Sequence, residues 1–243
     1  MNKEKCAVIL AGGKGTRLRP YTVAYPKPLV PVGEYPILEI IIRQLADQGF
    51  QRVIIAVNHQ AELIRAYFKD GEKYGIHIGY SLEYKPLGTM GPLALIRDLP
   101  ENFLVMNGDV LSDISYGEFL TEHEKSAHLF TISAFKREQY VDYGVLHIQG
   151  GSLTGFEEKP VLDYLVSMGV YAVSRNVLDY IPRDTFFGFD DLMERLLKEK
   201  KKVDVSIFDG YWLDIGRPDD YQQAVDEFEQ EKGRYLKVAG EQG

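Results

Sequence analysis

Short apolar runs alternate with amphipathic stretches through the first half of the chain. The runs predict four strands, at residues 6–10, 53–57, 76–82 and 103–106. Between them, apolar residues at helical spacing predict three helices, marked by Leu38, Ile41, Ile42 and Leu45, by Ala61, Ile64, Ala66 and Phe68, and by residues 92–97. Because strands separated by helices need crossover connections, we expect a mostly parallel sheet with both faces covered.

The second half of the chain has a different pattern. Strands are predicted in close succession at 129–135, 144–148, 152–156 and 166–173, some of them antiparallel because turn signals separate them. Two helices follow near 190–200 and 218–232, with a strand at 203–207 between them. We find no linker, low-complexity tract or solenoid repeat. The sequence therefore predicts one α/β domain over residues 1–243, with a core at about 5–232 and a loose C-terminal tail.

Composition supports a globular protein. The chain has 243 residues, of which 45% are hydrophobic and 26% charged, enough for one large domain with a buried core. No apolar run reaches the roughly 18 residues of a membrane helix, and the opening MNKEK leads into a strand pattern. We therefore expect a cytoplasmic protein that does not enter a membrane. Cys6, the single cysteine, lies among apolar residues and is expected to be buried and not catalytic.

Charge is unevenly distributed along the chain. The net charge is -8, yet residues 1–33 hold six Lys or Arg and a single acid, Glu4. An acidic protein lacks the broad basic surface that nucleic-acid binding requires, so we exclude a nucleic acid as its partner. One basic loop suits a small polyphosphate.

A glycine-rich loop follows the first predicted strand. In AGGKGTR, Gly12, Gly13 and Gly15 allow a tight turn that can bring backbone N–H groups close to an anion. The spacing matches neither the P-loop nor the dinucleotide-binding motif, because Leu18 stands where the latter needs its last glycine. A tight turn without a ligand therefore remains open on the glycines alone.

Cations after the glycines favour a phosphate site. Thr16, Arg17 and Arg19 follow directly, and a guanidinium can bind phosphate oxygens in bidentate fashion. Lys27 lies between two prolines in YPKPL, so the backbone around it is stiff and its ammonium is held in one direction. Because ligands of open parallel sheets bind beyond the strands' carboxyl ends, the loops after residues 10, 82 and 106 should share one crevice.

The motifs LAGGKGTRLRPYT and PKPLVPVG, with WLDIGRPDDY near the C-terminus, resemble the sugar-1-phosphate nucleotidyltransferases, over roughly residues 5–230. The resemblance implies a Rossmann-like α/β fold, the nucleotide-diphospho-sugar transferase fold, with a mixed, mostly parallel sheet flanked by helices. It also implies nucleoside triphosphate and sugar 1-phosphate as substrates and Arg17, Lys27 and Asp109 as catalytic residues. The implied nucleotide-binding residues are Leu10, Ala11, Gly12, Gly13, Gly15, Thr16, Arg17, Glu83, Gly88 and Thr89.

Two aspartates are candidates for a metal site. Two anionic substrates need more neutralisation than a few cations give, so a divalent metal on carboxylates is expected. Asp109 in MNGDVL follows a predicted strand at its carboxyl end, and Asp214 stands in WLDIG. Either residue alone could be a turn aspartate, but the resemblance implies that both hold one Mg²⁺. Asp113, Asp190 and Asp191 are interpreted as turn or cap residues.

Further motifs concern the base and the sugar. EYKPLGTMG resembles the family's base-binding loop, in which Glu83 or Lys85 would read the base edge, and Met90 replaces the usual alanine. FEEKP resembles the family motif in which Glu158 binds sugar hydroxyls and Lys159 the sugar phosphate. The implied sugar-phosphate-binding residues are Gly144, Glu158, Lys159 and Gly169. Met168 precedes that last glycine and cannot donate a hydrogen bond to a hydroxyl.

Several functions stay open at this stage. PKPLVPVG and PLGT are most like the mannose-1-phosphate guanylyltransferase branch and related small bacterial enzymes, which favours a mannose- or heptose-type 1-phosphate. Uridylyl-, cytidylyl- and thymidylyltransferases share much of the same signature. A noncatalytic relative that binds a sugar nucleotide is a second class, and a nicotinamide-dependent dehydrogenase is excluded by the glycine spacing. A homodimer is implied by the resemblance alone.

Overall fold

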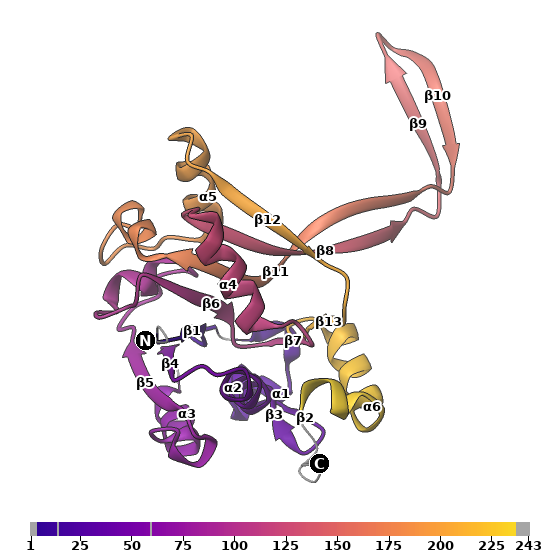
Figure 1. Cartoon of the computed structure of the whole chain (residues 1–243). Coiled ribbons are helices and arrows are strands. Elements are labelled where there is room, and N and C mark those ends of the chain that lie inside the picture. The colour runs from indigo at the N-terminus through magenta and orange to yellow at the C-terminus, as the bar shows by residue number, and fades with distance from the viewer. Residues whose placement is uncertain (1–3, 14, 59, 237–243) are drawn as a thin grey trace.

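The computed structural model of the chain describes residues 4–13, 15–58 and 60–236. Its centre is a seven-stranded sheet with the order β12-β8-β11-β6-β1-β4-β5 (Figure 1). These strands are β1 (Cys6–Leu10), β4 (Arg52–Val57), β5 (His77–Leu82), β6 (Asn102–Asn107), β8 (Phe130–Tyr140), β11 (Val161–Ser174) and β12 (Val203–Phe208).

The sheet is mixed and mostly parallel. β1 pairs in parallel with β4 and with β6, and the pairs β4–β5 and β8–β12 are also parallel. Only β11 runs in the opposite direction, between β6 and β8. The predicted fold class, a mostly parallel sheet flanked by helices, is confirmed.

Helices cover both faces of this sheet. One buried cluster includes residues of α2 (Ile37–Asp47), α3 (Ala61–Phe68), α4 (Tyr116–Ser126) and α6 (Pro218–Tyr235). The other includes residues of α5 (Phe189–Lys198) and of the 3-10 turns at Gly91–Leu95 and Arg175–Tyr180. Strand β1 contributes side chains to both clusters, because Ala7 and Ile9 face the first cluster and Cys6 and Val8 face the second. Cys6 is fully buried, as expected.

One predicted helix is wrong, another helix extends further than expected, and helix α4 was missed. Residues 92–97 do not form an α-helix but a five-residue 3-10 turn, Gly91–Leu95, because the backbone is already extended at Ile96, with φ of -85° and ψ of 124°. Helix α6 continues to Tyr235, beyond the expected start of the loose tail, and residues 237–243 lie outside the described chain. The missed helix, α4, had a readable signal: Tyr116, Phe119, Leu120 and His123 recur at helical spacing and are all buried.

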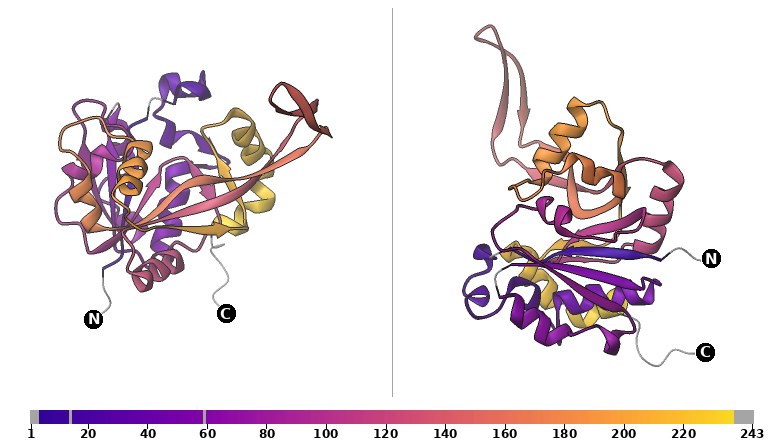
Figure 2. Two further views of the ribbon diagram at one scale, coloured as in Figure 1. Left: turned by 90° about the horizontal axis from the view of Figure 1, so that it is seen from above. Right: turned by 90° about the vertical axis from the view of Figure 1, so that its left-hand side faces the viewer.

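A long two-stranded arm projects from the body. Strands β8 and β11 run beyond the sheet. They stay paired from Phe130 opposite Val173 out to Tyr140 opposite Val161. They lead into the hairpin formed by β9 (Gly144–Gln149) and β10 (Ser152–Glu158). Figure 1 and the right-hand view of Figure 2 show this hairpin projecting away from the body of the molecule. We call residues 136–165 the arm.

Small ladders complete the structure. β2 (Pro31–Val32) pairs with β3 (Tyr35–Pro36), and β7 (Val110–Ser112) pairs antiparallel with β13 (Trp212–Asp214). A short helix, α1 (Tyr21–Ala24), and 3-10 turns at Thr16–Leu18, Lys27–Leu29 and Glu72–Tyr74 fill the connections. Within the described ranges, no helix combines the length and apolar character needed to cross a membrane.

Buried His123 makes stability depend on pH. Burial lowers the pKa of His123 from 6.5 to about 4, nearby His128 lowers it further and Asp204 opposes the shift. Its Nδ1 hydrogen-bonds the Thr131 hydroxyl at 2.7 Å, and Nε2 has no partner among the described residues. Between about pH 4 and pH 6.5, His123 binds a proton in the unfolded chain but not in the folded chain, so acidification favours unfolding.

We therefore predict that stability falls as the pH drops from 6.5 to 4, with His123 contributing on the order of 3 kcal/mol of the loss. Urea unfolding of the wild type and of His123→Gln across this range measures the effect. The variant should show the shallower dependence, because carboxylates titrate equally in both proteins. Parallel curves would mean that folding does not lower the pKa of His123.

Candidate active site

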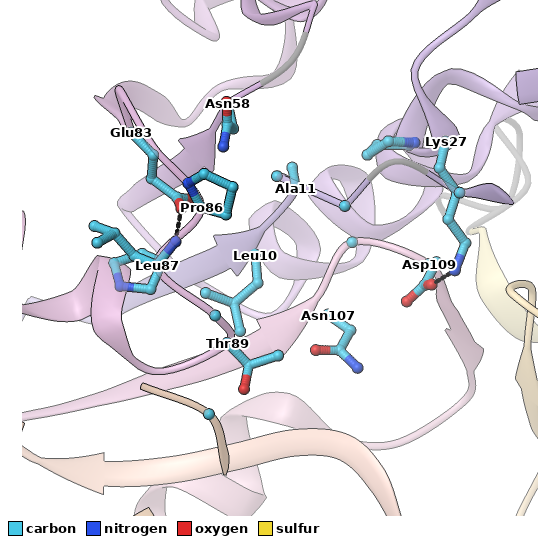
Figure 3. Close-up of a pocket in the computed structure, with 18 of the residues that line it drawn as sticks. Leu10, Ala11, Lys27, Asn58, Glu83, Pro86, Leu87, Thr89, Asn107 and Asp109 are labelled. Carbon is cyan, nitrogen blue, oxygen red and sulfur yellow. Dashed lines mark hydrogen bonds and ion pairs between the residues drawn. The ribbon is translucent and has the colours of Figure 1, made fainter. Parts of the chain in front are cut away.

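The main pocket lies where parallel strands end. It has a volume of about 860 Å³ and is lined by residues that follow β1, β5 and β6, such as Ala11, Glu83 and Asp109 (Figure 3). The three loops expected to share a crevice therefore do so. The predicted site residues that line it are Leu10, Ala11, Gly12, Gly13, Gly15, Lys27, Glu83, Gly88, Thr89 and Asp109.

Thr16 and Arg17 lie beside this pocket and not in its lining. Both belong to the exposed 3-10 turn Thr16–Leu18. The Arg17 guanidinium is still close enough to lower the pKa of Lys27. Neither side chain therefore lines the pocket, although Arg17 is close enough to Lys27 to act on it electrostatically.

Local sequence explains how the glycine loop and Lys27 come together. Gly15 has a φ of +60°, and a Cβ there would stand 2.9 Å from Cβ of Lys27 and from Cγ2 of Thr22, so only glycine permits this approach. The Thr22 hydroxyl donates to the Gly15 carbonyl at 2.7 Å. The loop after β1 is therefore packed directly against the lysine that follows Pro26.

Lys27 points to the carboxylate of Asp109. It begins a 3-10 turn between Pro26 and Pro28, and its ammonium forms an ion pair with Asp109 Oδ2 (Figure 3). Burial lowers the pKa of Lys27, the Asp214 carboxylate raises it and the Arg17 guanidinium lowers it. Both carboxylates thus act on one ammonium.

A ladder of two short strands brings Asp109 and Asp214 together. β7 and β13 pair Val110 with Asp214, and the Ile215 N–H donates to the Asp109 carbonyl at 2.9 Å. A Cβ on Gly216 would stand 2.9 Å from Asp214 Oδ1 and 3.3 Å from Asp109 Oδ2, with the Lys27 ammonium nearer still. Residues far apart in sequence therefore direct two carboxylates and one ammonium at a single point.

Hydrogen bonds fix Asp214 in this position. Its Oδ1 accepts from the Gly216 N–H at 2.9 Å, and its own N–H donates to Oδ2 of Asp220 at 3.0 Å. Asp220 is buried and also accepts from the Arg137 guanidinium at 2.9 Å. Arg137 in turn lies 4.8 Å over the Trp212 ring. Asp214 and Asp220 both stand in the motif WLDIGRPDDY, but no pattern in the sequence links them to Arg137, which lies 83 residues before Asp220.

The donor set fits a divalent cation. Two carboxylate oxygens converge on the point that the Lys27 ammonium approaches, so a positive charge is already stabilised there. No group of three or more His, Cys, Asp or Glu residues suited to metal binding exists within the described residues. Magnesium commonly binds one or two carboxylates and completes its shell with water and substrate phosphates, which is the arrangement that Asp109 and Asp214 offer.

A second pocket adjoins the first. Its volume is about 330 Å³, and Asn107 lines both pockets. Asp214 and Gly169, two of the predicted residues, line the second pocket and not the main one. Four residues that line one or both pockets were not among the predicted site residues: Asn58, Asn107, Arg137 and Arg217. Asn107 could have been found, because it ends β6 two residues before Asp109.

Gly169 is required for contact with Asn107. Its φ is +74°, and a Cβ there would stand 2.5 Å from Nδ2 of Asn107. Met168 before it is buried and accepts a hydrogen bond from the Ser133 hydroxyl on its sulfur, so it packs and does not contact the pocket through a polar atom. Trp212 donates from Nε1 to the Met168 carbonyl at 3.1 Å, which supports the packing role expected of it.

The opposite end of the main pocket holds Glu83 and the loop after β5. Glu83 is only 6% exposed, burial raises its pKa, and the Leu87 N–H donates to Oε2 at 3.3 Å and opposes that shift. Thr89 accepts a hydrogen bond from the Phe189 N–H at 2.8 Å. Met90 is fully buried and therefore packs behind the pocket. Lys85 pairs with Asp184 and is half exposed.

Three predicted sugar-binding residues lie elsewhere. Gly144, Glu158 and Lys159 are all on or beside the projecting hairpin and line neither pocket. Lys159 is exposed and pairs with Asp142 at 2.7 Å. The structure does not bring these residues together with Asp109, so their role stays a prediction from resemblance.

Three other aspartates were interpreted as turn or cap residues. Asp191 accepts from the Gly188 N–H and so caps α5, and Asp113 accepts from the Tyr211 N–H, as interpreted. Asp190 also lines the main pocket.

The glycine loop provides a paired test of this geometry. A Cβ on Gly12 would stand 2.8 Å from Glu83 Oε1, whereas a Cβ on Gly13 meets nothing within 4 Å. We predict that Gly12→Ala lowers the free energy of unfolding by about 1 kcal/mol, because the buried Glu83 carboxylate must shift, and that Gly13→Ala changes it by less than about 0.5 kcal/mol. Urea unfolding of both variants measures this. Equal losses would show that Glu83 does not stand against Gly12.

Known proteins of similar sequence are nucleotidyltransferases. The chain is 33% identical over 240 residues to a UTP--glucose-1-phosphate uridylyltransferase of Synechocystis, covering 90% of this chain and 62% of that protein. It is 36% identical over 219 residues to the D-glycero-alpha-D-manno-heptose 1-phosphate guanylyltransferase of Campylobacter jejuni, covering 88% and 96%. The chain thus spans about 62% of the length of the first relative and nearly all of the second.

Solved structures show the same architecture. HddC from Yersinia pseudotuberculosis superposes with a TM-score of 0.73 at 28% identity, covering 92% of this chain and 99% of that one. That protein has also been solved in complex with GMP-PN. Residues 6–231 match the sequence pattern of the nucleotidyl transferase family, and this match takes in every residue of both pockets. The chain belongs to the nucleotidyl transferase family.

Proposed function

We propose that the chain transfers a nucleoside monophosphate from a nucleoside triphosphate to a sugar 1-phosphate and releases pyrophosphate. The observation that carries this proposal is the convergence of Lys27, Asp109 and Asp214 at the border of two pockets. The main pocket has the glycine loop and the volume for a nucleotide, and the adjoining pocket has Arg137 and Arg217 for an anionic acceptor. Family membership supports the same reaction class.

The reaction needs no covalent enzyme intermediate. An oxygen of the sugar phosphate attacks the α-phosphorus in line, a new phosphorus–oxygen bond forms, and the bond to the bridging oxygen of the β-phosphate breaks. Pyrophosphate leaves with that electron pair. Lys27 would neutralise charge that builds on the α-phosphate, Arg17 beside it would bind the leaving phosphates, and the glycine loop would orient the triphosphate.

We propose Mg²⁺ as the metal, held by Asp109 and Asp214. When bound it supplies neutralisation of the charge on the two reacting phosphates. The residues of this chain do the positioning: the hydrogen bonds from Gly216 and to Asp220 hold Asp214 in place, and the β7–β13 ladder holds Asp109 beside it. Lys27 then acts as the fixed cation of the site.

For the substrates, we propose a guanine nucleotide and a mannose- or heptose-type 1-phosphate. The guanylyltransferase of Campylobacter jejuni, which matches along 96% of its length, and the GMP-PN complex of HddC support this choice. The uridylyltransferase of Synechocystis supports the alternative of a uridylyl transfer to another sugar 1-phosphate. Cytidylyl and thymidylyl transfer remain alternatives from the sequence signature. A noncatalytic sugar-nucleotide-binding relative is disfavoured because Arg17, Lys27, Asp109 and Asp214 are all retained.

A panel experiment tests the proposal. GTP, UTP, CTP, dTTP and ATP are each combined with several sugar 1-phosphates, and pyrophosphate is measured in the presence and absence of Mg²⁺. We expect release that requires both substrates and the metal, fastest with GTP and a sugar of the manno configuration. Fastest release with UTP would establish the uridylyl alternative, and no release with any pair would favour the noncatalytic relative.

A further inference from the structure

Asp220 is a buried carboxylate that lines neither pocket but supports a residue of the site. It lies in the first turn of α6 and is 6% exposed. Its Oδ2 accepts two hydrogen bonds, from the Asp214 N–H at 3.0 Å and from Nη2 of Arg137 at 2.9 Å. Within the described residues, Arg137 is its single cationic partner. Because a buried carboxylate is costly unless it is paired, Arg137 is what allows Asp220 to hold Asp214.

Arg137 is itself held in one place. It belongs to β8 at the base of the arm, and its guanidinium lies 4.8 Å from the centre of the Trp212 ring and 5.9 Å from that of Phe135. The Trp212 ring is a fixed support, because it is buried and its Nε1 donates to the Met168 carbonyl at 3.1 Å. A planar guanidinium stacks on such a face, which an ammonium cannot do.

The same guanidinium also reaches the second pocket. The Arg137 side chain is 32% exposed and lines that pocket together with Asp214. A guanidinium has five N–H donors, and within the described part of the chain only Nη2 of Arg137 has a hydrogen-bond acceptor. The free donors suit two oxygens of a phosphate. Arg137 can therefore bind an anion in the pocket without releasing Asp220.

We propose that Arg137 is a positioning residue that joins the second pocket to the metal ligand: it holds Asp214 in place through Asp220 and binds the phosphate of the sugar with its remaining donors. This rests on the proposed function, because it takes the second pocket as the site of the sugar 1-phosphate and Asp214 as a ligand of Mg²⁺. One side chain then aligns the acceptor with the metal.

Arg217 is the matched comparison. It is also an arginine of the second pocket, but it is exposed, and its guanidinium pairs with none of the described residues. Loss of either arginine removes a positive charge from the pocket that Asp214 lines, and by charge alone this favours cation binding. Weaker cation binding after loss of Arg137 therefore reports a loss of position, since the effect of charge has the opposite sign.

Mn²⁺ binding to the protein without substrates, measured by electron paramagnetic resonance, tests the positioning role. Arg137→Met should raise the Mn²⁺ dissociation constant by about 10-fold, as expected for a residue that orients a metal ligand. Arg217→Met should bind Mn²⁺ at least as tightly as the wild type. The double variant Arg137→Met with Asp220→Asn removes the unpaired charge and leaves an amide oxygen for the Asp214 N–H. It should recover the wild-type Mn²⁺ affinity to within about threefold.

Steady-state kinetics separates the two roles of Arg137. Arg137→Met and the double variant should both raise KM for the sugar 1-phosphate by about 10-fold and leave KM for the triphosphate unchanged. Lys136→Met is the control, because Lys136 precedes Arg137 on β8 but pairs with Asp163 and lines neither pocket. It should keep both constants.

Urea unfolding establishes that each variant is folded under the assay conditions. If Arg137→Met is not, Arg137→Lys replaces it in both measurements. A lysine keeps the charge beside Asp220 but has a single nitrogen, so it cannot bind the carboxylate and a phosphate as a fork does. It should bind Mn²⁺ like the wild type and still show the raised KM for the sugar 1-phosphate.

Four results would overturn the proposal: wild-type Mn²⁺ affinity in Arg137→Met, an equal loss in Arg217→Met, no recovery in the double variant, or a wild-type KM for the sugar 1-phosphate in that variant. A wild type that binds no Mn²⁺ overturns it together with the metal assignment. The expected Mn²⁺ pattern without any pyrophosphate release would refute the proposed reaction alone, so the two failures are distinguishable.

Discussion

Lys27→Ala is expected to lower kcat by about 10³-fold, because it removes a fixed cation from the point where two phosphates must meet. The ammonium is held between two prolines, pairs with Asp109 and is influenced by Asp214. A flexible residue elsewhere cannot replace it, since its position is set by the backbone. Steady-state rates of pyrophosphate release at saturating substrates give the effect.

Lys125→Ala is the control for this change. Lys125 is also a lysine in an ion pair, with Glu122, but it lies on the exposed side of α4. The control should keep the wild-type rate. If Lys27→Ala also kept a rate within about tenfold of the wild type, Lys27 would not supply the transition-state stabilisation assigned to it.

Asp214→Asn should have the second largest effect, a loss of about 10²- to 10³-fold in kcat with a weakened response to Mg²⁺. The amide keeps the size of the side chain and can still accept from the Gly216 N–H, so the fold should persist. What it loses is one of the two charges that converge with Lys27. Two measurements check this: the rate as a function of Mg²⁺ concentration, and direct binding of Mn²⁺ to the protein.

Asp113→Asn provides the comparison. Asp113 is next to the same β7–β13 ladder, but its carboxylate accepts from the Tyr211 N–H and lines neither pocket. It should retain Mn²⁺ binding and the wild-type metal response. Equal losses in the two variants would mean that the ladder and not the Asp214 charge is responsible. Normal Mn²⁺ binding by Asp214→Asn would remove that residue from the metal site.

The central sheet could be predicted because most of its strands are recognisable from their own run of apolar residues. β1, β4 and β6 are short apolar runs, and α2 and α3 show helical spacing, so the alternation that implies parallel strands was readable. Short two- and three-residue strands such as β7 and β13 exist only through pairing with distant partners, so no local pattern reports them. The single-domain and cytoplasmic interpretations stay predictions.

The site could be predicted where one motif carries several of its residues. The glycine loop and Lys27 lie within one stretch of sequence, and their packing against each other follows from it. Arg137 could not be found in this way, because it reaches the second pocket from β8 and belongs to no motif. Arg217 could have been found, because it stands in WLDIGRPDDY three residues after Asp214. The length of the arm was underestimated because the polar residues 136–140 hide the continuation of β8.

We propose that this chain joins a nucleotide to a sugar phosphate by direct displacement at one shared site. Incubation with triphosphate carrying ³²P at the α-position tests it most directly. We expect label to enter a nucleotide sugar only when Mg²⁺ and a sugar 1-phosphate are both present, and never to remain on the protein. Label bound covalently to the chain, or released as nucleoside monophosphate without sugar, would contradict the account.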